Sequence, residues 1–64
     1  MKLWIARDKT GYIGIYYEKP IWKENKLGIK DWVGHFMGYL SKQSFPEVTF
    51  ENSPQEVELK LIKT

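Results

Sequence analysis

The chain contains no cysteine, so neither a disulfide nor a thiolate–metal site can stabilise it. Its single histidine, His35, has no set of further ligands at the spacing that a metal site needs. Because a structural zinc takes four protein ligands, we expect no metal and place His35 on the surface or in a turn. The lack of cysteine is also consistent with a reducing cytoplasm.

Long apolar runs are absent as well. No segment approaches the roughly 20 apolar residues of a membrane-spanning helix, and Arg7 and Asp8 interrupt the N-terminal stretch MKLWIARDK, which is unlike a signal peptide. We therefore expect a cytoplasmic protein without a membrane partner.

Charge of one sign is also scarce. The net charge is +2, with seven basic and four acidic side chains in residues 1–32 and three basic and four acidic in residues 33–64. A nucleic-acid module usually carries a denser basic stripe. The charge therefore supports nucleic acid only weakly as a partner.

Nothing in the sequence matches a catalytic or phosphate-binding motif. The five glycines, at positions 11, 14, 28, 34 and 38, fit neither phosphate-loop pattern. Asp8, Glu18, Asp31 and Glu47 could serve as general acids. However, a chain of 64 residues has little room for both a core and a catalytic pocket of ~300 Å³. We predict a non-enzymatic protein with no cofactor and no catalytic residue.

Aromatic residues are what the chain has in quantity: three Trp, four Tyr and three Phe in a single domain, residues 1–64. A domain this small buries only about 60% of the surface that its unfolded chain exposes. Each aromatic side chain can bury roughly 150–250 Å². Most of these rings are therefore expected to build the core.

Two alternating segments, KLWIAR and YIGIYYE, flank the tetrapeptide DKTG. The position of Gly11 fits the left-handed residue that follows a type I turn, which predicts a hairpin with a G1 bulge. The predicted cross-strand pairs are Asp8–Tyr12, Arg7–Ile13, Ala6–Gly14, Ile5–Ile15, Trp4–Tyr16, Leu3–Tyr17 and Lys2–Glu18. In this register Lys2–Glu18 and Trp4–Tyr16 are both favourable neighbours.

This register also sorts the hairpin side chains into two faces. One face carries Leu3, Ile5, Ile13, Ile15 and Tyr17. The other carries Lys2, Trp4, Ala6, Tyr12, Gly14, Tyr16 and Glu18.

Pro20 ends the second strand, and residues 21–28 (IWKENKLG) are predicted as a polar loop. The next segment has apolar residues at helical spacing, but Gly34 and Gly38 would each cost a helix about 1 kcal/mol relative to Ala. We predict two short strands instead, Lys30–Val33 and Phe36–Leu40, with a glycine-containing turn between them.

After these strands, Ser41–Phe45 is predicted as a single helical turn, which Pro46 ends. Asn52, Ser53 and Pro54 form a turn. The last strand is predicted to run from about Gln55 to Ile62, with Val57, Leu59 and Leu61 pointing inward. The expected fold is mostly β: about five short strands in a twisted antiparallel sheet or small, partly open barrel, with one short helical turn.

The segments IARDKTG, EKP and FPEVTFENSPQEVELKLI resemble a family of very small proteins encoded by gut bacteria and their phages or mobile elements. The resemblance covers roughly residues 3–20 and 45–62. It implies a compact β-rich fold and an origin in a mobile element. It brings no activity, cofactor or catalytic residue with it.

The candidate binding site is the second face of the first hairpin. Its rings are Trp4, Tyr12 and Tyr16, and its flanking cations are Lys2, Lys9 and Lys19. Such a face can be a hot spot for a protein partner or can stack single-stranded bases, and it can equally be core covered by the middle of the chain. We predict a binding or accessory module that acts through protein–protein contacts. The alternatives are single-stranded nucleic-acid binding and a self-associating structural subunit.

Overall fold

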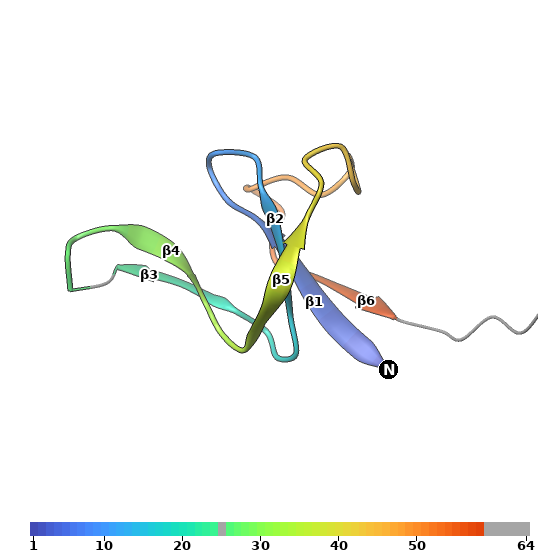
Figure 1. Ribbon diagram of the computed structural model, residues 1–64, viewed down its shortest axis with the longest axis horizontal. Coiled ribbons are helices and arrows are strands. Elements are labelled where there is room, and N and C mark those ends of the chain that lie inside the picture. Colours follow the sequence, from blue (N-terminus) through green and yellow to red (C-terminus); the bar gives the residue numbers. More distant parts are fainter. Residues whose placement is uncertain (25, 59–64) are drawn as a thin grey trace, which may run out of the picture.

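The computed structural model describes residues 1–24 and 26–58, which form two antiparallel sheets (Figure 1). The strands are β1 (Lys2–Arg7), β2 (Ile13–Tyr16), β3 (Ile21–Glu24), β4 (Lys30–Val33), β5 (Phe36–Leu40) and β6 (Gln55–Glu58). Four of them form one sheet in the order β5-β2-β1-β6, and β3 and β4 form a separate hairpin. The described ranges contain no helix, and the sheet does not close into a barrel.

The predicted register of the first hairpin is confirmed from Trp4–Tyr16 to Arg7–Ile13. Asp8 stabilises the turn in two ways. Its backbone N–H donates to the Tyr12 carbonyl at 2.9 Å, and its carboxylate accepts from the backbone N–H groups of Thr10 and Tyr12 at 2.9 and 3.1 Å. Gly11 has a φ of +100°, as the turn type requires.

The paired part of this hairpin stops at Trp4–Tyr16, so the predicted Lys2–Glu18 pair is not formed. β1 continues instead against β6, where Lys2 is opposite Glu58 and its ammonium group lies 3.9 Å from Glu56. The carboxylate of Glu18 lies 3.6 Å from Nδ1 of His35.

The strands Lys30–Val33 and Phe36–Leu40 are confirmed at their predicted bounds. The loop prediction for residues 21–28 is wrong at its start, because residues 21–24 form β3 and pair with β4, with Trp22 opposite Trp32. The cross-strand tryptophan pair stabilises β3. The polar residues of this segment are the reason why the sequence indicated a loop.

Ser41–Phe45 is not a helical turn. The Ser44 N–H donates to the Ser41 carbonyl at 2.9 Å, which closes a single β-turn, and Phe45 then adopts a φ of +49°, outside the helical region. The final strand is described for Gln55–Glu58, and the predicted inward positions Leu59 and Leu61 lie outside the described residues.

The main core lies on the face of the sheet that carries Ile5 and Ile13, which are 1% and 0% exposed. Val48, from the connection between β5 and β6, packs on them and is 4% exposed. Partly buried Ile15, Leu40 and Val57 surround this centre. The inward assignment of Val57 is thereby confirmed. Tyr17, predicted on this face, is 53% exposed.

The single arginine of the chain holds the β5–β6 connection in place. Its guanidinium nitrogens donate to five backbone carbonyls: Nε to Val48 at 2.6 Å, Nη1 to Gly11 and Lys42 at 2.6 and 3.0 Å, and Nη2 to Ser44 and Phe45 at 3.0 and 3.2 Å. A guanidinium has five N–H donors, so Arg7 uses all of them. In the described part of the chain no carboxylate forms an ion pair with it.

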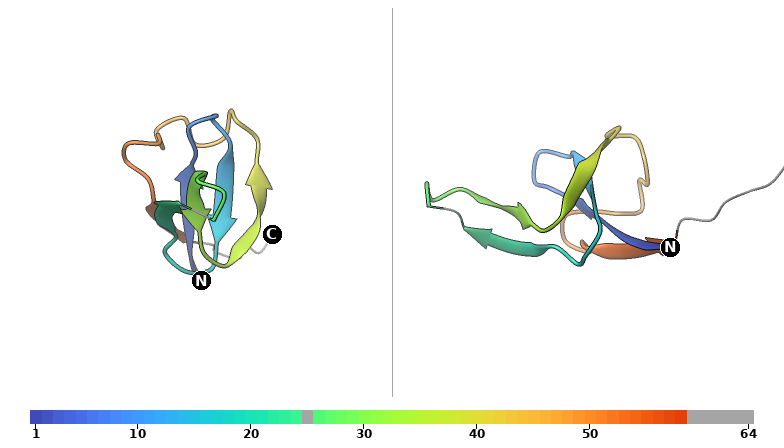
Figure 2. Two further views of the ribbon diagram at one scale, coloured as in Figure 1. Left: turned by 90° about the vertical axis from the view of Figure 1, so that its left-hand side faces the viewer. Right: turned by 60° about the horizontal axis from the view of Figure 1, so that its bottom comes forward.

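The backbone of Arg7 extends the same network. Its N–H donates to Ser53 Oγ at 2.9 Å, and its carbonyl accepts from Trp32 Nε1 at 3.1 Å. Arg7 therefore joins the first hairpin to both ends of the β5–β6 connection and to the β3–β4 hairpin, which extends away from the four-stranded sheet (Figure 2).

Truncation of Ile13 to alanine is expected to destabilise the protein by about 2–5 kcal/mol, because it opens a cavity in a fully buried site. The matched control is Ile21→Ala, since Ile21 is a strand isoleucine that is 64% exposed. We expect the control to change stability by no more than about 0.5 kcal/mol. Urea denaturation followed by circular dichroism measures both. Equal effects would contradict the assignment of the core.

Replacement of Arg7 by lysine is expected to cost roughly 2–4 kcal/mol of unfolding free energy, because hydrogen bonds from charged donors are lost. Lysine keeps the charge, but its compact ammonium group cannot donate hydrogen bonds to all the carbonyls that surround the planar guanidinium. The measurement is again urea denaturation, with the exposed Lys23→Met as the control. Wild-type stability in Arg7→Lys would show that charge alone, and not the fork, holds the connection.

Candidate functional site: an aromatic row at the β5 edge

β5 is an edge strand of the four-stranded sheet and carries large exposed apolar side chains. It pairs with β2 on one side, and its other side is an edge among the described residues. Phe36, Met37 and Tyr39 are 49%, 43% and 65% exposed, and the strand FMGYL has no charged residue. Natural edge strands usually carry charge or are covered, so this edge is unusual.

A β-bulge in β5 decides which side chains share a face. Gly38 is opposite Ile15, but Phe36 is opposite Tyr16, so Met37 is an extra residue between them. Gly38 takes a φ of +152°, which side-chain-bearing residues rarely adopt. Because of the bulge, Phe36 and Tyr39 lie on one face although they are three positions apart.

Four rings follow one another across β5, β2 and the residue that precedes β2. The ring centroids of Tyr12 and Tyr39 are 5.9 Å apart, those of Tyr39 and Phe36 are 4.7 Å apart, and those of Phe36 and Tyr16 are 5.6 Å apart. These spacings are typical of tilted and edge-to-face aromatic pairs. We call Tyr12, Tyr39, Phe36 and Tyr16 the aromatic row.

Tyr16 is the buried end of this row, at 6% exposure. Its ring lies over Gly14, where a Cβ atom would come within 2.9 Å of the Tyr16 hydroxyl oxygen. Gly34, which follows β4, lies close to the same ring, because a Cβ atom at Gly34 would come within 3.4 Å of Tyr16 Cδ2. Desolvation by burial raises the pKa of Tyr16 to about 12, and the charges of Asp31 and other groups add to it. Tyr16 therefore acts as core, whereas Tyr12 is 48% exposed.

The other predicted site residues are divided among different surroundings. Trp4 is half-buried beside Tyr16 in the register, and Lys19 Nζ lies 5.6 Å from its ring centroid. Lys2 lies beside Glu56. Of the predicted cations, Lys19 is the one found at a ring of the predicted face.

Lys9 belongs to a second aromatic cluster. Its Nζ lies 5.9 Å from the Trp22 ring and 5.4 Å from the Phe50 ring. Phe50 packs on Trp22 at 4.7 Å, and Trp22 on Trp32 at 5.2 Å. This cluster joins the β3–β4 hairpin to the β5–β6 connection and has a structural role.

Phe36, Tyr39 and Lys42 were missed by the sequence-based prediction. Lys42 Nζ lies 4.3 Å from the Tyr12 ring centroid, which makes it the closest cation–ring contact among the residues that the structure describes. The alternation in FMGYL signals a strand, but nothing in the sequence indicates that this strand pairs with β2. Only that pairing brings Phe36 and Tyr39 to the first hairpin.

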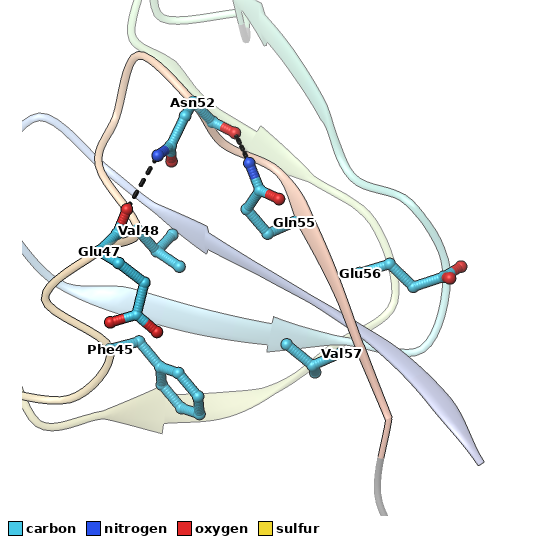
Figure 3. Close-up of a pocket in the computed structure, with 7 residues that line it drawn as sticks. All are labelled: Phe45, Glu47, Val48, Asn52, Gln55, Glu56 and Val57. Carbon is cyan, nitrogen blue, oxygen red and sulfur yellow. Dashed lines mark hydrogen bonds between the residues drawn. The ribbon is translucent and has the colours of Figure 1, made fainter.

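One hollow lies between β6 and the connection that precedes it (Figure 3). It has a volume of about 300 Å³ and is lined by Phe45, Glu47, Val48, Asn52, Gln55, Glu56 and Val57. The Asn52 side chain donates to the Glu47 carbonyl at 2.9 Å, and Gln55 donates to the Asn52 carbonyl at 2.5 Å. The side-chain amide groups that line this hollow therefore stabilise the connection between β5 and β6.

The remaining titratable candidates have local roles. Asp8 accepts the turn amides, Asp31 accepts from the Trp32 N–H at 2.8 Å, and Glu18 lies beside His35 on the surface. Among the described residues, no three His, Asp or Glu side chains come together as metal ligands.

No family model, curated protein or solved structure matches the chain. The resemblance to very small proteins of gut bacteria and their mobile elements therefore stays a prediction. Within residues 1–24 and 26–58, no helix is long and apolar enough to cross a membrane.

Burial of Tyr16 predicts a loss of stability at high pH. Its pKa is about 12 in the folded state and near 10 when unfolded, so the neutral hydroxyl stabilises the fold fully below pH 10 and less as the pH rises towards 12. In Tyr16→Phe, which keeps the ring, the unfolding free energy should fall less between pH 10 and pH 12 than in the wild type. Denaturation at several pH values tests this. Equal slopes for the two proteins would place the Tyr16 hydroxyl in water.

Proposed function

We propose that this chain is a non-enzymatic binding module that acts through protein–protein contacts at the β5 edge. The observation that carries the proposal is the exposure of Phe36, Met37 and Tyr39 together on one uncharged edge strand. A monomer has no folding reason to display so much apolar surface in one place. That the protein serves a bacterial or phage mobile element rests on the sequence resemblance alone.

Two features of the edge suit an extended protein segment. An exposed edge strand offers backbone N–H and C=O groups to an added strand, which supplies affinity without regard to sequence. The exposed rings of Tyr12, Phe36 and Tyr39 supply side-chain contacts of the kind that dominate binding energies. The edge and the rings lie side by side, so one partner strand could use both.

Single-stranded nucleic acid is the second candidate, because Lys42 and Lys19 lie over rings of this face. Bases could stack on the rings while the lysines contact phosphates. This candidate has less support, since Lys9 packs in another cluster and Lys2 lies beside Glu56. Oligonucleotide binding with a steep salt dependence would favour it over a protein partner.

The double variant Met37→Ser, Tyr39→Ser should keep the fold and lose partner binding, because both side chains are exposed at the edge. The matched control is Tyr17→Ser, Ile21→Ser, which removes a tyrosine and an aliphatic residue of similar exposure elsewhere. Circular dichroism verifies folding, and affinity capture from host extract compares the bound proteins. A folded β5 variant that captures the same proteins as the wild type and the control would refute the proposal.

A further inference from the structure

We draw no further inference here: the strongest candidate, the apolar hollow of about 270 Å³ on the core face of the four-stranded sheet, which Leu3, Ile15, Leu40, Phe45 and Val57 help to line, is an unpartnered apolar surface, and nothing in the part of the chain that the structure describes shows what covers it.

Discussion

The Arg7 guanidinium connects segments that no strand pairing joins. Its five hydrogen bonds reach the turn of the first hairpin and four carbonyls between residues 42 and 48. These bonds position Val48, which completes a core whose centre otherwise consists of Ile5 and Ile13. They also help to hold Phe45 in its strained conformation, with a φ of +49°. The Phe45 carbonyl accepts hydrogen bonds from both Arg7 and the Val48 N–H. Since a 64-residue chain without disulfides has little stability to spare, the remaining structure depends on this one side chain.

Local patterns predicted the parts of the fold that local physics determines. The DKTG turn specifies one hairpin register, and that register is the one observed. The bounds of β4 and β5 also follow from glycine positions and alternation. What failed depended on distant partners. β3 is a strand because Trp22 pairs with Trp32, and Ser41–Phe45 is not helical because Arg7 holds its carbonyls. No sequence spacing indicates that one arginine donates hydrogen bonds to backbone carbonyls that lie 35 to 41 positions away.

Only part of the candidate site could be predicted, because the rest depends on a distant strand pairing. The hairpin register places Trp4, Tyr12 and Tyr16 on one face, but it does not say what lies beyond β2. The structure brings β5 to that side and divides the predicted face in two. Tyr16 becomes core beside Gly34, and the exposed rings continue onto β5 through Tyr39 and Phe36. The exposed apolar surface therefore lies at the edge strand and not at the centre of the first hairpin.

The β3–β4 hairpin has a consequence for how the native state opens. No backbone ladder joins it to the four-stranded sheet in the described structure. The contacts that attach it include the ring contacts of Trp22 and Trp32 with Phe50, the Lys9 ammonium group over the Trp22 ring and the Trp32 hydrogen bond to Arg7. Such a unit can detach and re-dock without loss of the main core, so its amides should exchange with solvent through a sub-global opening of lower free energy than global unfolding. In kinetic terms, we expect this small chain to behave as two cooperative units of unequal lifetime.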